Sequence, residues 1–320
     1  MDVRNQTLPP QQTTCLLLAL LCLICAGLVL LLPTSAFASS TQDDDATLIP
    51  ATASRVETIA TRYRGVIADD GRYRVSTRFS SFDGEPLSVG FELPSNASDA
   101  SLNEFGISEA ELNAVLNRCI ASGPCEQAEL DRQTTHYYRA HGLRLRTVPG
   151  RQSHLYVDVA QVVRRNRSRV QPVAAALRQL AETRGRDAQW TMDAAVALVQ
   201  TGLVYRKPSL RENGRQILGF YPPPRALESG YGDCDTKAAL LAAILQNLTD
   251  APIIGVHVPK HYLLGIAATP QPGQATLRYR GTRYVLVEAA GPGKRPPGDI
   301  ATSTQTALND MSGVRIDPMF

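Results

Sequence analysis

One cysteine occupies a position where its thiol could act as a nucleophile. Cys234 lies in the segment 230–237 (GYGDCDTK), ahead of an Ala/Leu-rich stretch to Leu248 that predicts a largely buried helix. With Asp233 as the N-cap, Cys234 falls in the first helical turn, where unpaired backbone N–H groups and the helix dipole favour a thiolate. The carboxylates of Asp233 and Asp235 oppose that charge, so activation requires a histidine partner. The alternative is a buried, inert cysteine.

The strands expected after this helix carry a histidine and a carboxylate. The pattern predicts strands over 253–258, over 261–267 with His261 at the start, and over 283–288 with Glu288 at the end. A turn at Arg280-Gly281 would join the second and third strands as a hairpin, so His261 and Glu288 could face each other across the ladder. A thiol nucleophile, an imidazole base and an orienting carboxylate are the groups that perform acyl transfer.

Other residues compete for these roles. His257 is a second candidate base, although in its strand it would point away from the face of its apolar neighbours, and Asp299 is the reserve carboxylate. For the oxyanion that forms during acyl transfer, the candidate donors are the Gln200 side chain and the backbone N–H of Cys234. A helix-surface amide is the competing interpretation of Gln200. The five histidines lack the spacing of metal ligands, and the sequence predicts no metal site and no cofactor.

The run GDCDTK at 232–237, followed by His261 at the start of one strand and an acidic residue at the end of the next, resembles the transglutaminase-like superfamily. The resemblance covers residues 190–297. It implies an α+β fold with a papain-like core, in which a Cys-bearing helix packs on an antiparallel sheet. It also implies that Cys234 is the nucleophile, His261 its base and Glu288 the orienting carboxylate.

Residues upstream of Cys234 resemble the bacterial, extracytoplasmic branch of that superfamily, which includes cysteine proteinases. Val199-Gln200-Thr201, Tyr205 and a proline-rich loop carry this part of the resemblance. Glu288 replaces the usual Asp, and no Trp lies shortly before Cys234 as in animal transglutaminases. The resemblance implies acyl transfer or amide hydrolysis on a protein or peptide, with hydrolysis favoured over cross-linking to an amine. The alternative is a catalytically inactive module that binds or scaffolds at the cell envelope.

The N-terminus carries an apolar run over residues 15–32, which must leave water as a signal-peptide core or as a membrane span. Ala36-Phe37-Ala38 then places small residues at the positions that signal peptidase reads, which favours cleavage after Ala38. The alternative is an uncleaved anchor formed by residues 15–32. Either outcome predicts an extracytoplasmic protein, periplasmic or secreted, and the polar segment 39–54 is expected to be a linker.

Composition is that of a globular protein. The 320 residues are 43% apolar, which excludes a disordered chain, and a net charge of +3 with 6% aromatic residues argues against nucleic-acid binding. Cys119 and Cys125 flank Gly123-Pro124, a turn that would let them form a disulfide in an oxidising compartment. That pairing would leave Cys234 as the lone thiol downstream of the signal segment.

The pattern divides the chain after the linker into an N-terminal mixed β/helical domain over 55–150 and a transglutaminase-like catalytic domain over 151–320. In the first domain we expect strands and hairpins over 56–93, a helix behind a capping box of Ser108 and Glu111, and a helix over 126–140. In the second we expect a helix over 173–180, another capped by Thr191, and a long irregular loop over 208–230.

Overall fold

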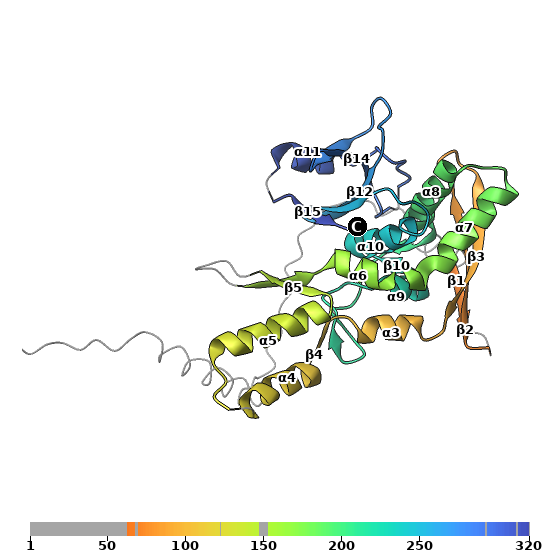
Figure 1. The fold of residues 1–320 in the computed structure, drawn as a ribbon. Helices are drawn as coiled ribbons and strands as arrows, with labels where there is room; N and C mark the ends of the chain where they lie inside the picture. Colours follow the sequence, from red (N-terminus) through yellow and green to blue (C-terminus); the bar gives the residue numbers. More distant parts are fainter. Residues whose placement is uncertain are drawn as a thin grey trace, which may run out of the picture. The chain divides into compact units, whose positions relative to one another are not determined.

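A computed structural model describes residues 63–67, 70–121, 123–146, 153–291, 293–311 and 313–319 (Figure 1). All of them belong to one compact unit, Ala51–Phe320. The expected signal segment 1–38 and linker 39–54 lie outside the described residues. Helices and mainly antiparallel sheets share the chain, which confirms the expected α+β class. The boundary near residue 150 stays a prediction.

A five-stranded antiparallel sheet carries His261 and leads to Glu288. Its strand order is β13-β14-β12-β11-β15. The strands are β11 (Ile253–Val258), β12 (His261–Ala267), β13 (Thr276–Tyr279), β14 (Thr282–Val287) and β15 (Arg315–Pro318). β11, β12 and β14 confirm the three predicted strands, and β12 pairs with β14 so that Leu264 lies opposite Val287.

The turn at Arg280-Gly281 joins β13 to β14, so the prediction that it joins β12 to β14 is wrong. Both turn residues have positive φ, 48° and 84°, as a two-residue type I′ hairpin requires. β13 is a short edge strand of exposed and half-buried residues, and therefore lacks the apolar run that marks a strand in sequence. β14 has two edges: one pairs with β13 and the other pairs with β12, so β12 and β14 are still neighbours in the sheet.

A second antiparallel sheet is formed by β1 (Tyr63–Ile67), β2 (Arg72–Ser80) and β3 (Pro86–Pro94), which confirms the strands expected over 56–93. Along β2 and β3 every second side chain is buried, as the two-residue period of a half-buried strand requires. The inward residues are Val75, Thr77 and Phe79 on β2 and Leu87, Val89, Phe91 and Leu93 on β3. This buried face packs against α7 (Gln171–Thr183), which confirms the helix predicted over 173–180.

Helix α10 (Cys234–Leu245) forms the centre of the hydrophobic core. Its residues 236–245 are all buried, because α6 (Val159–Asn166), α7, α8 (Ala188–Ala197), α9 (Pro223–Ser229) and β12 pack around it (Figure 1). The near-continuous Ala/Leu composition therefore reflects burial on every side. Only the first turn of α10, with Cys234, approaches the surface.

The predicted Thr191 cap of α8 is wrong, because Asp187 is the N-cap and its carboxylate accepts a hydrogen bond from the Trp190 N–H at 2.8 Å. Thr191 is buried inside the helix, where its hydroxyl donates to the backbone oxygen of Asp187. Both residue types are good N-caps, and the helix begins at the earlier one.

The segment 208–230 is not the irregular loop that its prolines and glycines predict. It contains a short hairpin, β8 (Arg211–Glu212) and β9 (Arg215–Gln216), and the helix α9. Pro223 and Pro224 lie in the first turn of α9, where a missing N–H costs no intrahelical hydrogen bond.

Two helices, α4 (Glu109–Ala121) and α5 (Gln127–Ala140), form a hairpin and confirm both predicted helices. Cys119 and Cys125 form the expected disulfide across the connection, with a Cα–Cα distance of 5.5 Å. The other elements are α3 (Ala97–Asn103), β4 (Ile107–Ser108), β5 (Leu143–Arg146), β6 (His154–Val157), β7 (Val204–Tyr205), β10 (Tyr231–Gly232) and α11 (Thr302–Asp310).

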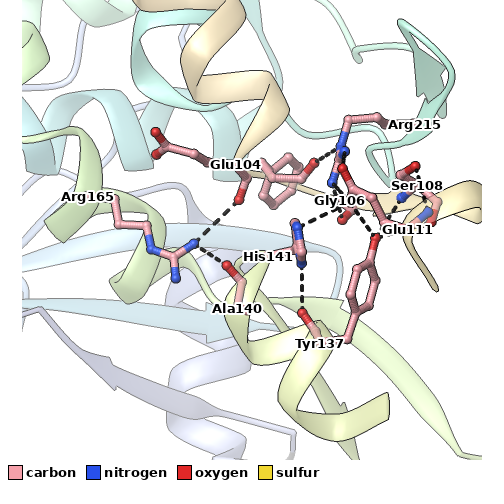
Figure 2. A network of polar contacts seen from close by, with 10 residues as sticks. Glu104, Gly106, Ser108, Glu111, Tyr137, Ala140, His141, Arg165 and Arg215 are labelled. Atoms are coloured by element: carbon pink, nitrogen blue, oxygen red, sulfur yellow. Dashed lines mark hydrogen bonds and ion pairs between the residues drawn. The ribbon is translucent and has the colours of Figure 1, made fainter. Parts of the chain in front are cut away.

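A buried arginine fastens this hairpin to the rest of the chain (Figure 2). Arg215 donates to both carboxylate oxygens of Glu111, at 2.8 and 3.1 Å, and to the backbone oxygens of Phe105 and Gly106. The hydrogen bond from Arg215 holds the pKa of Glu111 below its ordinary value. The capping box is therefore half formed: the Glu111 N–H donates to the Ser108 hydroxyl, but the Glu111 carboxylate binds Arg215.

Candidate active site

Cys234 is the first residue of α10 and directly follows the N-cap Asp233, as predicted. A side chain at Gly232 would overlap the side chain of Thr236, so glycine is needed for the strand to turn closely into the helix. The thiol therefore lies at a helix N-terminus, where unpaired backbone N–H groups favour negative charge. Among the described residues, Cys234 is the cysteine outside the disulfide.

His261 and Glu288 meet as the sequence predicts. The Nε2 atom of His261 lies 2.6 Å from Oε2 of Glu288, and the two side chains are 22% and 6% exposed. The hydroxyl of Thr304 donates to the other carboxylate oxygen at 3.2 Å. Burial favours the neutral acid, but the hydrogen bond and charge of His261 outweigh it and lower the pKa of Glu288. The pair is thus an imidazolium and a carboxylate.

The imidazole of His261 also hydrogen-bonds to Cys234. Because Nε2 faces Glu288, Nδ1 is the nitrogen left to face the thiol. Burial lowers the pKa of His261, but the hydrogen bonds to Cys234 and Glu288 and the charges of both raise it to about 9. The three predicted residues therefore form one connected group in the order thiol, imidazole, carboxylate.

The two aspartates beside Cys234 differ from the sequence expectation, which gave both a negative charge. Burial raises the pKa of Asp235 to about 8, and the hydrogen bond and charge of Asp233 add to this effect. At neutral pH Asp235 therefore keeps its proton. Protonated Asp235 adds no negative charge beside the thiol, which weakens the opposition to a thiolate.

Gln200 is not free to donate a hydrogen bond to an oxyanion, because its side-chain amide is bonded within the protein. It lies in the π-helical segment Leu198–Gly202, and it is buried, so the interpretation as a helix-surface amide is wrong. Its amide nitrogen donates to the backbone oxygens of Glu288 at 2.7 Å and Arg295 at 2.8 Å, and its oxygen accepts from the Arg295 N–H. Both amide hydrogens are engaged, so Gln200 fastens the segment after β14 and has none left for a substrate oxygen.

The competing residues have other partners. His257 pairs with Tyr262 and Arg315 on the neighbouring strands, and burial followed by the charge of Arg315 lowers its pKa. Asp299, the reserve carboxylate, is half exposed and accepts a hydrogen bond from Arg295 at 2.8 Å. Neither contacts the group of Cys234 and His261 in the described part of the chain.

Lys237 is a feature that sequence reasoning did not assign. It follows Cys234 by one turn of α10 and is completely buried. Its ammonium donates to three backbone oxygens, those of Gln200 and Leu203 at 3.2 Å and of Ala290 at 2.6 Å. Burial lowers its pKa to about 7. Lys237 thereby connects the cysteine helix to the segment that follows Glu288, and its isolation in an otherwise apolar helix was the signal in the sequence.

Tyr205 also lies beside the thiol, although the sequence assigned it no role. It ends β7, which runs parallel to β10 so that Tyr205 pairs with Gly232. Its hydroxyl hydrogen-bonds to Cys234, and the residue is 49% exposed. A cleft of about 240 Å³ opens beside the imidazole and is lined by His261, Glu288 and Arg295 among others. Cys234 is only partly buried and the His261 side chain is 22% exposed, so both reach the surface.

Comparison of the chain with protein-family models, curated proteins and solved structures finds no match. Over the described ranges, no helix has the length and apolar character needed to cross a membrane. The apolar run over residues 15–32, with its alternatives of signal core and anchor, lies outside those ranges.

Proposed function

We propose that this chain is an exported transglutaminase-like cysteine enzyme with a papain-like core, which performs acyl transfer or amide hydrolysis on a protein or peptide. The observation that carries the proposal is the connected group of Cys234, His261 and Glu288, in which the imidazole contacts the thiol and lies 2.6 Å from the carboxylate. A thiol at a helix N-terminus with an imidazolium beside it has the surroundings of an activated nucleophile.

The reaction has two steps. The sulfur of Cys234 attacks the carbonyl carbon as a thiolate beside the imidazolium of His261, and the carbonyl electron pair moves onto oxygen. The pair then returns, the C–N bond breaks, and His261 gives its proton to the departing amine, which leaves a thioester. In the second step His261 takes a proton from water, whose oxygen attacks the thioester, and the C–S bond breaks. Glu288 holds the imidazole in orientation and stabilises its charged form.

Water is the favoured second acceptor, and an amine in its place would give cross-linking. The predicted signal segment assigns the protein to an extracytoplasmic compartment, and the disulfide between Cys119 and Cys125 is compatible with it. The cleft beside His261 is open to solvent and lined by both polar and apolar residues, which is compatible with a protein or peptide substrate.

The test begins with the thiol, because no substrate need be known. We expect iodoacetamide to alkylate Cys234 at pH 7 faster than an ordinary thiol, and the Cys234→Ala variant to lose this labelling. With casein as a general protein substrate, Cys234→Ala should abolish hydrolysis, His261→Ala should lower it by roughly 10²- to 10⁴-fold, and Glu288→Gln should lower it less. His257→Ala is the matched control and should retain activity.

The opposing function is an inactive module that binds or scaffolds at the cell envelope. An alkylation rate no faster than that of an ordinary thiol, in protein with an unchanged melting transition, would favour it. Inactivation by His257→Ala with full activity in His261→Ala would overturn the choice of base.

A further inference from the structure

Acyl transfer needs donors for the oxyanion, and the described site offers few. The backbone N–H of Cys234 is one candidate, because the first N–H groups of a helix have no intrahelical partner. Gln200, the side chain that the sequence suggested, is engaged on backbone oxygens. A second donor must therefore come from another side chain that reaches the sulfur.

Tyr205 is fixed in such a place by its backbone. On either side of it, the Val204 N–H donates to the Gly230 oxygen at 2.9 Å and the Arg206 N–H donates to the Gly232 oxygen at 3.1 Å. This parallel pairing puts Tyr205 in register with Gly232, two residues before Cys234. The hydroxyl then reaches the thiol and hydrogen-bonds to it. Because 49% of its surface is exposed, Tyr205 is accessible to a substrate that reaches Cys234.

The hydroxyl also keeps its proton, as a donor must. Burial raises the pKa of Tyr205, and the charges of Cys234, Asp233 and Asp235 raise it further. A protonated phenol donates one hydrogen bond. In the resting site the sulfur can accept it. Once the sulfur is bonded to carbon it is a weak acceptor, and the adjacent oxyanion is a strong one.

We propose that the Tyr205 hydroxyl is a catalytic donor to the oxyanion during attack by Cys234, an inference that rests on the proposed acyl transfer. As the C–S bond forms and the carbonyl electron pair moves onto oxygen, the Tyr205 O–H turns from sulfur to that oxygen. No proton is transferred from the phenol. When the tetrahedral intermediate collapses, the hydrogen bond weakens again.

Two reagents separate this role from an effect on the thiol itself. p-Nitrophenyl acetate acylates a thiol through a tetrahedral oxyanion, whereas iodoacetamide reacts at a saturated carbon and forms none. We expect Tyr205→Phe to lower the acylation rate of Cys234 by roughly 10²- to 10³-fold. The same variant should keep the iodoacetamide rate within about fivefold of the wild type. The ring remains, so folding should be preserved, as an unchanged melting transition will verify.

The matched control is Tyr231→Phe, which removes a hydroxyl from the adjacent strand that hydrogen-bonds to Tyr221 at 2.9 Å. It should leave both rates unchanged. If Tyr205→Phe lowers the rates with both reagents equally, or lowers neither, the oxyanion role is overturned. The proposed function would still stand in that case, because the wild type is acylated. Failure of the wild type to be acylated at all would overturn both.

Discussion

The charge of Glu288 is what we expect to set the protonation of His261, and Glu288→Gln tests it. The substitution keeps the size of the side chain and removes its negative charge from a position 2.6 Å from the imidazole. In the wild type, the hydrogen bonds to Cys234 and Glu288 raise the pKa of His261 to about 9 against the effect of burial. Without the carboxylate, burial continues to disfavour the imidazolium, so the pKa must fall.

The size of the fall follows from the loss of an adjacent opposite charge, which moves a pKa by about 1–3 pH units. His261 should therefore titrate between about pH 6 and 8 in Glu288→Gln. The assay is an NMR titration of protein with ¹³C-labelled histidine, whose five histidines are assigned by single substitutions. Asp299→Asn is the control, because it removes an exposed carboxylate that pairs with Arg295 instead. It should leave the titration of His261 unchanged.

The same pair makes stability depend on pH. The folded pKa of His261, about 9, lies above its ordinary 6.5, so this contribution is complete below pH 6.5 and is lost as the pH rises through about 9. At low pH the stabilisation of the fold by this pair is lost when the Glu288 carboxylate is protonated. Because the pKa of Glu288 is lowered in the fold, this loss occurs below its ordinary pKa. Urea unfolding should find the largest difference between wild type and Glu288→Gln between these limits. An unmoved titration of His261 in Glu288→Gln would refute the reasoning.

Two other predictions concern positions outside the catalytic group. Gly291→Ala should destabilise the fold more than Gly273→Ala in urea unfolding: both glycines have positive φ, 64° and 85°, but only at Gly291 would a side chain overlap the backbone oxygen of Gln200. Equal losses would show that backbone strain alone, about 1–2 kcal/mol, accounts for both. A non-reducing digest of protein from an oxidising compartment should contain Cys119 and Cys125 in one linked peptide, and finding both as free thiols would contradict the disulfide.

Local signals predicted the parts of the fold that depend on neighbours in the chain. The helix after Cys234, the strand that opens at His261 and the disulfide across a short turn all follow from nearby residues and were confirmed. The error at Thr191 has the same origin, since Asp187 offers an equally good cap one turn earlier and local preference does not choose between them.

The roles of several site residues could not be predicted from the sequence, because they depend on contacts between segments that are distant in the chain. Gln200 and Lys237 look like ordinary polar residues on their helices, and only the packing of α10 against the segment after β14 turns them inward. Tyr205 reaches Cys234 because β7 lies parallel to β10, a pairing of two residues each that has no pattern of its own. The meeting of His261 with Glu288 could be predicted from the expected pairing of their strands. The contacts of Gln200, Lys237 and Tyr205 could not, because they depend on the tertiary fold.

The acidic neighbours of Cys234 show how burial changes the meaning of a motif. Read as a sequence, Asp233 and Asp235 place two negative charges beside a thiol that must ionise. In the fold the two carboxyl groups lie together, and Asp235 keeps its proton until about pH 8 while His261 keeps its own until about pH 9. Below these values Asp235 adds no negative charge beside the sulfur and His261 is an imidazolium, which suits a thiolate. Above them the Asp235 carboxylate appears and the imidazolium disappears, so both changes act against the thiolate in the same alkaline range.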